Sequence, residues 1–355
     1  MRHERQLWLD NIKGLAVLSV VLAHVANMYY DHGMYKECAG FFSFISNVMD
    51  AFMMPLFFII SGYSFGLAYV DRRDESNYRI KLKTSKVHRQ MLNLFLVYVV
   101  WGVGYCFLKS RFSEEVLVSS KLSDILWMPV KAPSLFWYIY VLIICYIIIE
   151  LCCKSKYGIL VLFASSFILC IFQYWITDNG STEYSAILIS RYLLFFMMGF
   201  WCYIDRNIID RMNSKGISVL MLCAGIIIEI FYWCFGVRNF KDNRFIWSDI
   251  PGWGMIIPIL ISGGLFLVAK LYNEKQILNL LGKYSLEIYL LHRYVMMIFR
   301  KSIPYSGIEN GVLAFFVNVL ITLSCCIAIA WLLRKCILGK LLFEPGRLIY
   351  ETKNL

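Results

Sequence analysis

Long apolar runs, separated by short polar stretches, repeat along the whole chain. A helix needs about 20 apolar residues to cross the hydrocarbon of a bilayer, and a window of that length predicts ten spans. The second span is too long for one straight crossing, and Pro55 and Gly62 within it predict a kink or a break. The pattern predicts an all-α fold, a polytopic membrane bundle of about ten transmembrane helices. The approximate bounds are 12–30, 41–70, 91–109, 134–152, 157–176, 185–203, 216–235, 251–272, 284–300 and 310–333.

The composition supports a membrane protein. Of the 355 residues, 59% are apolar and 17% are charged, whereas soluble proteins have about 45–50% and about 25%. This excludes a soluble globule, a disordered chain and a disulfide-rich secreted module. No linker divides the chain, so residues 1–355 are expected to form a single integral-membrane domain. The cysteines lie mostly within apolar runs and are interpreted as small buried hydrophobic residues, and no metal is expected.

The positive charges define an orientation. The formal net charge is +11, yet the Lys and Arg residues lie in short loops between spans, which does not favour nucleic acid as a partner. If the N-terminus is cytoplasmic, the inner loops and tails hold 22 of these cations and the outer loops hold 10. The positive-inside rule then predicts that both termini are cytoplasmic.

Ionisable side chains on the first span form a stripe. Lys13 and His24 are eleven residues apart and therefore share a helix face, and Asp10 lies one turn from Lys13. The stripe predicts His24 near the middle of the membrane, with a cation and a carboxylate at the cytoplasmic end below it. Two alternatives stay open: His24 only hydrogen-bonds within the bundle, and Lys13 only extends to the lipid headgroups.

Several stretches resemble the membrane-bound acyltransferase 3 family. The hallmark of the opening helix in this family is a basic residue, ten further residues and a histidine, which Lys13 and His24 match. The surrounding residues 8–16 and 20–24 also resemble that helix. Four more stretches agree with the family in the same order, at residues 54–63, 135–138, 195–199 and 282–292.

This resemblance implies transfer of an acyl group, usually acetyl from acetyl-CoA, to a hydroxyl of an extracytoplasmic glycan or related acceptor, such as a lipid-linked sugar. It also implies a multi-pass protein of a bacterial inner membrane. Lys13 replaces the commoner arginine, which looks closer to the branch that acetylates sugars such as fucose. The family's Arg-x-x-Arg motif, thought to hold CoA phosphates, is present as Lys86 and Arg89, and the usual following proline is absent. Positive-inside bias alone also explains Lys86 and Arg89.

The residues suggest how such a transfer would proceed. A hydroxyl needs a base, and a neutral imidazole such as His24 can take and return a proton near neutral pH. His292 is interpreted as a helper that lines the site, with a structural role as the alternative, and it shares a face with Tyr289. We expect the acyl group to travel through the bundle along a passage that Val17 and Val20 line.

The outer side carries candidates for the acceptor. Trp137, Arg191 and Trp233 suit a sugar, although an aromatic belt at the membrane interface gives the same composition. Arg191 is the stronger candidate because a cation within an apolar helix rarely lacks a function. Glu150 and Glu229 are interpreted as structural, and the role of Asp50, like that of Glu287, is left open.

Two other classes of protein fit parts of the pattern. A secondary transporter also has charged residues in its spans, a broken helix and a basic inner face, but the two halves show no convincing internal repeat. A sensor or assembly protein leaves the stripe of Lys13 and His24 without a purpose. Transfer or hydrolysis of acyl-CoA by the purified protein separates these classes. The acceptor, the acyl length and the oligomeric state stay open.

Overall fold

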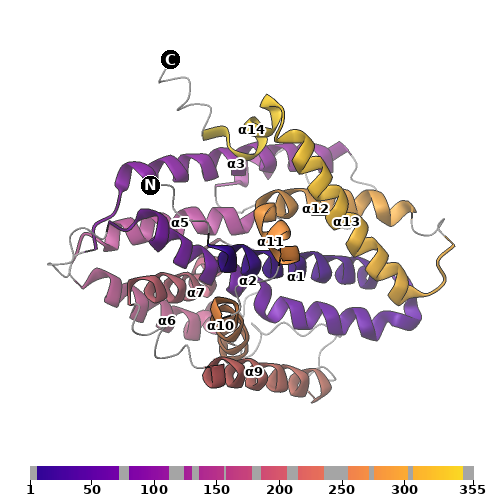
Figure 1. The fold of residues 1–355 in the computed structure, drawn as a ribbon, viewed down its shortest axis with the longest axis horizontal. Coiled ribbons are helices and arrows are strands. Elements are labelled where there is room, and N and C mark those ends of the chain that lie inside the picture. The colour runs from indigo at the N-terminus through magenta and orange to yellow at the C-terminus, as the bar shows by residue number, and fades with distance from the viewer. Residues whose placement is uncertain are drawn as a thin grey trace. The chain divides into compact units, whose positions relative to one another are not determined.

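The computed structural model describes residues 6–71, 80–111, 124–129, 136–155, 157–177, 185–205, 215–235, 255–271, 276–302 and 307–346. In this part of the chain nearly all residues are helical, and the only β-pairing is a bridge between Val70 and Leu82 (Figure 1). Each predicted span has become a helix. These helices are α1 (Leu7–Asp31), α2 (Ala39–Tyr69), α3 (Thr84–Arg111), α5 (Trp137–Cys152), α6 (Gly158–Thr177), α7 (Ser185–Ile204), α9 (Lys215–Phe235), α10 (Ile256–Leu271), α12 (Ser285–Ser302) and α13 (Gly311–Leu333).

The described ranges also contain the shorter helices η1 (Lys36–Cys38), α4 (Asp124–Trp127), α11 (Gln276–Lys283) and α14 (Ile337–Phe343). The sequence predicts a kink or a break at Pro55, and helix α2 runs without a break through this residue. Proline removes one backbone hydrogen bond, and packing by neighbouring helices makes this tolerable within membranes. The residues on both sides of Pro55, Met54 and Leu56, are buried.

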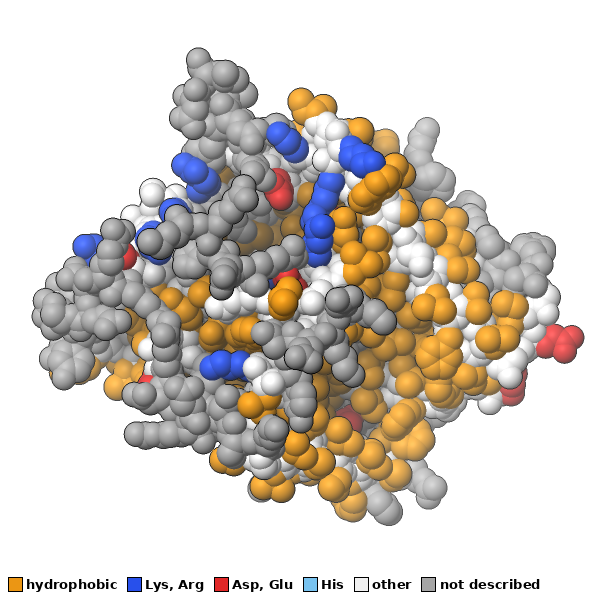
Figure 2. All heavy atoms as spheres, viewed as in Figure 1, with side chains coloured by type: hydrophobic (Ala, Val, Ile, Leu, Met, Phe, Trp, Pro, Cys, Tyr) orange, Lys and Arg blue, Asp and Glu red, His pale blue; other side chains and the backbone are white. Residues whose placement is uncertain are grey.

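The helices have the length and composition of membrane spans. Among the described residues, Leu7–Asp31, Lys36–Tyr69, Thr84–Phe107 and Gly311–Leu333 are long and apolar enough to cross a bilayer, and five shorter helices are apolar as well. The exposed side chains of α13 include Leu313, Phe316 and Leu320, and Figure 2 shows apolar side chains over this side of the molecule. Such a surface is expected to face lipid. The predicted polytopic helical membrane bundle is therefore confirmed.

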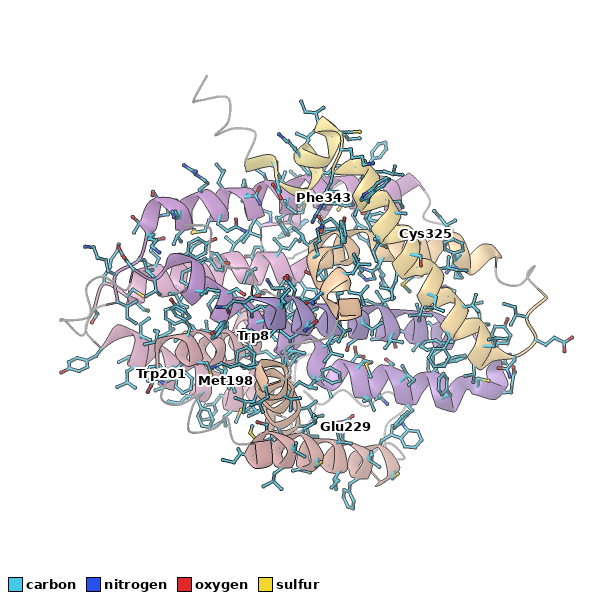
Figure 3. The ribbon with its side chains drawn as sticks, viewed as in Figure 1. Trp8, Met198, Trp201, Glu229, Cys325 and Phe343 are labelled. Atoms are coloured by element: carbon cyan, nitrogen blue, oxygen red, sulfur yellow. The ribbon has the colours of Figure 1, made fainter. Side chains whose placement is uncertain are left out.

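The chain divides into two compact units, residues 1–60 with 204–332 and residues 61–203 with 333–355. That 1–355 functions as a single domain stays a prediction. In the first unit, α1 packs against α10, α11 and α12. Trp8, near the start of α1, contacts Phe266 of α10 with ring centroids 5.4 Å apart (Figure 3). Near the end of α1, the Tyr29 hydroxyl donates to the Ala314 carbonyl of α13 at 3.1 Å.

In the second unit, α3 packs against α4, α5 and α14. The Trp101 indole donates to the Leu342 carbonyl at 2.8 Å, which fastens α14 to α3. Gly62 of α2 lies directly against α7, since a Cβ at this position would be 1.9 Å from the Phe196 carbonyl oxygen. The Ser61 and Tyr138 hydroxyls are hydrogen-bonded at 2.6 Å. The last two contacts hold three of the stretches that resemble the acyltransferase 3 family, residues 54–63, 135–138 and 195–199, in close packing.

Candidate functional site

Helices α1 and α12 run parallel and in register. The rings of His24 and His292 stack with centroids 5.2 Å apart and planes 20° apart. Two turns further along both helices, Arg300 donates to the His32 ring. The partners are 268 residues apart in both pairs, so the two helices keep the same register between these contacts. The sequence-predicted base and its predicted helper are thus side by side.

The hydrogen bond of His292 fixes its tautomer. Nδ1 lies 3.0 Å from the Ile288 carbonyl oxygen, and because a carbonyl can only accept, Nδ1 carries the hydrogen. In the neutral ring Nε2 is then the basic nitrogen. Nε2 is buried and has no hydrogen-bond partner among the described residues. Buried polar atoms are nearly always paired, so an open nitrogen here indicates a place for a substrate hydroxyl or thiol.

Arg293 is a feature of this site that the sequence analysis missed. Its guanidinium interacts electrostatically with both His24 and His292, and its side chain is half-buried. A cation in this place can stabilise negative charge that develops on a substrate oxygen. The rule applied to Arg191, that a cation within an apolar helix has a function, applies equally to Arg293.

At the start of α1, two glycines allow α11 to come very close. A Cβ on Gly282 would lie 1.8 Å from the Asp10 carbonyl oxygen, and a Cβ on Gly14 would lie 2.0 Å from the Leu278 carbonyl oxygen. Only glycine fits at both positions, because the atoms that it meets belong to the backbone. The crossing brings the end of α11 beside Asp10 and the adjoining Lys13.

The face of α1 between Lys13 and His24 is closely packed. Asp10 is buried, and Lys13 and His24 are both half-buried. Val17 and Val20, which the sequence analysis placed along a passage, are 0% and 1% exposed. The predicted passage is therefore closed at these two side chains, and a pantetheine arm that followed this face would have to displace them.

Lys86 and Arg89 belong to the second unit, where they lie exposed in the first turns of α3. Two backbone hydrogen bonds, Asp71 N–H to the Lys81 carbonyl at 2.7 Å and Lys83 N–H to the Tyr69 carbonyl at 2.8 Å, join the end of α2 to the segment before α3. Such exposed cations have the chemistry for binding phosphate.

His88, one of the two residues between these cations, contacts a carboxylate. His88 lies 2.8 Å from Glu150 of α5, and this contact orients the start of α3. The contact agrees with the structural interpretation of Glu150.

The predicted acceptor residues Arg191 and Trp137 lie near each other in the second unit. The Trp137 ring is 4.9 Å from the ring of Tyr192, the neighbour of Arg191 on α7. Arg191 itself is half-buried, and its carbonyl accepts a weak hydrogen bond from the Cys170 thiol at 3.8 Å. The rings of Trp137 and Tyr192 therefore join α5 to α7 at the residue that follows Arg191.

The predicted site residues thus fall into two groups. The first unit holds Asp10, Lys13, His24 and His292, and the second unit holds Lys86, Arg89, Arg191 and Trp137. Within the first unit, His24 and His292 are in contact, and Asp10 and Lys13 lie at the start of the helix that carries His24. Among the described residues, no three His, Cys, Asp or Glu side chains are placed to hold a metal ion.

Comparison with known proteins identifies the family of the chain. The family model Acyl_transf_3, described as an acyltransferase domain, matches residues 6–332. The inner membrane protein YcfT of Escherichia coli (strain K12) is 20% identical over 327 residues, which covers 83% of this chain and 81% of YcfT. No solved structure matches.

Proposed function

Because the chain belongs to the acyltransferase 3 family and is therefore a membrane acyltransferase, we propose that it moves an acetyl or other short acyl group from acyl-CoA to a hydroxyl. The acceptor in this proposal is an extracytoplasmic glycan or a related lipid-linked sugar. The observation that carries the proposal is the stacked pair of His24 and His292, with one basic ring nitrogen that has no partner within the described structure. The similarity to YcfT, which is named as an inner membrane protein, supports an inner-membrane location.

In the proposed reaction the acyl group passes directly from the thioester sulfur of acyl-CoA to the hydroxyl oxygen of the acceptor. The acceptor oxygen attacks the thioester carbonyl while His24 takes the hydroxyl proton. The carbon–sulfur bond then breaks, and the proton passes from His24 to the departing thiolate, so that ester and free CoA thiol are the products. His292 accepts a hydrogen bond at Nε2 and holds the acceptor, and Arg293 stabilises the oxyanion.

The charged donor is held at the cytoplasmic side. Lys13, Lys86 and Arg89 are assigned to the phosphates of CoA, whose nucleotide end cannot enter hydrocarbon. The thin pantetheine arm, at roughly 1.5–2 nm, is about as long as half of the apolar slab and can reach toward His24. Asp10 supports Lys13 from the same face of α1. Arg191 and Trp137 are assigned to the acceptor.

The test uses the purified protein with acetyl-CoA and four free sugars, D-glucose, D-galactose, L-fucose and N-acetyl-D-glucosamine, and measures release of the CoA thiol. His24→Gln is expected to lower sugar-dependent release by about 10²-fold or more. His292→Gln is expected to raise the acceptor KM because it removes the Nε2 acceptor. His32→Gln, at the residue that directly follows α1, is the matched control and should stay near wild type. Near-normal turnover in His24→Gln would move the base to another residue.

A further inference from the structure

A second group of polar side chains lies within the first unit, on the C-terminal side of His24 along α1. Asn27 of α1 lies about one turn beyond His24, roughly 4.5 Å further along the helix axis. The Ser46 hydroxyl lies 2.7 Å from the Asn27 side-chain oxygen and 3.2 Å from an Asp50 carboxylate oxygen. Glu229 of α9 interacts electrostatically with Asp50. Together with Asn47, these residues are called the polar cluster: Asn27, Ser46, Asn47, Asp50 and Glu229.

Two contacts fix how α2 meets its neighbours around the polar cluster. The rings of Phe44 and Trp233 meet edge to face with centroids 5.0 Å apart, which joins α2 to α9. The Ser262 hydroxyl of α10 donates to the Phe52 carbonyl at 3.2 Å. Glu229 lies one turn before Trp233 on α9, so its carboxyl enters the space beside Asp50, and Figure 3 shows its place on that helix.

The polar cluster contains two groups that the described residues leave unsatisfied. Glu229 is 2% exposed, and its Oε2 has no hydrogen-bond partner. Asn47 is 5% exposed, and its Nδ2 has none either. Residues turn by about 100° along a helix, so Asn47 lies about 60° from both Phe44 and Asp50. Because Phe44 and Asp50 both interact with α9, Asn47 faces α9 as well.

These open groups have opposite character. Glu229 Oε2 is an acceptor, and the Asn47 amide nitrogen is a donor. A buried polar atom without a partner destabilises the fold, so the pair indicates a ligand that supplies both functions. A hydroxyl does so, since it donates to the carboxylate and accepts from the amide. A bare cation would pair with Asp50 and Glu229 but would leave the amide hydrogens of Asn47 without a partner.

An aromatic surface adjoins the polar cluster. Trp233 is one turn from Glu229, and Phe44 holds it in place. Sugar rings present several hydroxyls on their edges and an apolar C–H face, and they suit a carboxylate beside an indole. The Asp50 carboxylate is held in place by hydrogen bonds with Ser46 and Asn27.

We propose that Asn47, Asp50 and Glu229 bind non-reacting hydroxyls of the acceptor, a sugar or similar polyol, about one helical turn from His24. This inference rests on the proposed function, because it names the acceptor subsite of that transfer. It replaces the structural interpretation of Glu229 and gives Asp50 a role. The ring hydroxyls that the polar cluster holds set which remaining hydroxyl reaches His24, so the cluster determines the position of acylation.

Binding is measured without any acyl donor, by saturation-transfer NMR of the purified full chain with each of the four sugars named above. Glu229→Gln and Asn47→Leu are expected to weaken the sugar affinity about tenfold or more, as for the loss of a hydrogen bond to a charged group or of a buried donor. Glu309→Gln removes an exposed carboxylate of the same unit and serves as the matched control. The KM for acetyl-CoA should stay constant in all three variants.

The outcomes separate the two proposals. A wild-type protein that binds a sugar but releases no CoA thiol with any of them counts against the proposed function. An active wild type whose Glu229→Gln and Asn47→Leu variants keep full sugar affinity overturns the subsite, as does a wild type that binds none of the four sugars. If transfer by the wild type depended on sodium or potassium, and Glu229→Gln lost this dependence while its sugar affinity stayed unchanged, the polar cluster would be a cation site. This result would also overturn the proposed sugar subsite.

Discussion

Replacement of Gly282 by alanine tests whether the close crossing of α1 and α11 positions the catalytic helix. The added Cβ would lie 1.8 Å from the Asp10 carbonyl oxygen, whereas ordinary van der Waals contact begins at 3.4 Å. The two helices must therefore separate by about 1.6 Å, since the atom that is met belongs to the backbone and cannot rotate away. Overpacking of this kind costs about 1–3 kcal/mol, so most of the protein should still fold and insert.

The effect on catalysis should be much larger than the effect on folding. A displacement of about 1 Å in positioned groups can cost about 10²-fold in rate. We therefore expect Gly282→Ala to lower sugar-dependent release of CoA thiol by about 10²-fold, measured on the monodisperse fraction from gel filtration. Because Lys13 adjoins the crossing, the variant should show a higher KM for acetyl-CoA together with a lower kcat.

Two glycines of the same unit provide controls. Gly40 and Gly216 have nothing within 4 Å of the position that a Cβ would take, so alanine fits at both. Alanine within a helix stabilises by about 0.5–1 kcal/mol relative to glycine, and these variants should be as active as wild type. If monodisperse Gly282→Ala transferred acetyl within twofold of wild type, the crossing would not position the site and the reasoning would be refuted.

Three further predictions concern residues outside the histidine pair. Lys86→Gln and Arg89→Gln should each raise the KM for acetyl-CoA several-fold, and the difference from wild type should shrink with added salt, because salt screens contacts to phosphate; a difference that stays constant with ionic strength would contradict the assignment. Arg191→Gln should raise the acceptor KM and leave acceptor-free hydrolysis of acetyl-CoA unchanged, and an unchanged acceptor KM would remove Arg191 from the acceptor site. Burial lowers the pKa of His32, and the nearby Arg300 cation lowers it further against the opposing Met28 carbonyl. The unfolded chain then binds a proton at His32 more readily than the folded chain does, so the melting temperature should fall as the pH is lowered from about 8 to about 5. The fall should be smaller in His32→Gln. Equal falls in the two proteins would show that His32 is not the group responsible.

The sequence predicts the spans well because each membrane span requires a continuous apolar segment of about 20 residues, which is visible in the sequence. It also predicts that Lys13 and His24 share a face, since both belong to one helix with a known repeat. The contact of His24 with His292 cannot be predicted in this way, because the local sequence does not determine which helices pack against each other. Only the motif resemblance brought His292 into consideration.

The contact between Glu229 and Asp50 could not be predicted from the sequence for the same reason. Glu229 and Asp50 are 179 positions apart in the chain, and each by itself is one acid in an apolar helix. Their interaction depends on the packing of α2 against α9, which Phe44 and Trp233 fix. Arg293 differs, since its place within a span was visible. The rule used for Arg191 would have selected it.

The parallel pairing of α1 with α12 affects when activity can arise during synthesis. His24 leaves the ribosome 268 residues before His292, an interval of tens of seconds at typical elongation rates of about 5–20 residues per second. During that time α1 is already in the membrane without its catalytic partner, and the paired site is absent from any chain that ends early. In the proposed mechanism, a product that ends before residue 292 therefore lacks one of the two histidines. Synthesis through His292 is then a condition for the proposed chemistry.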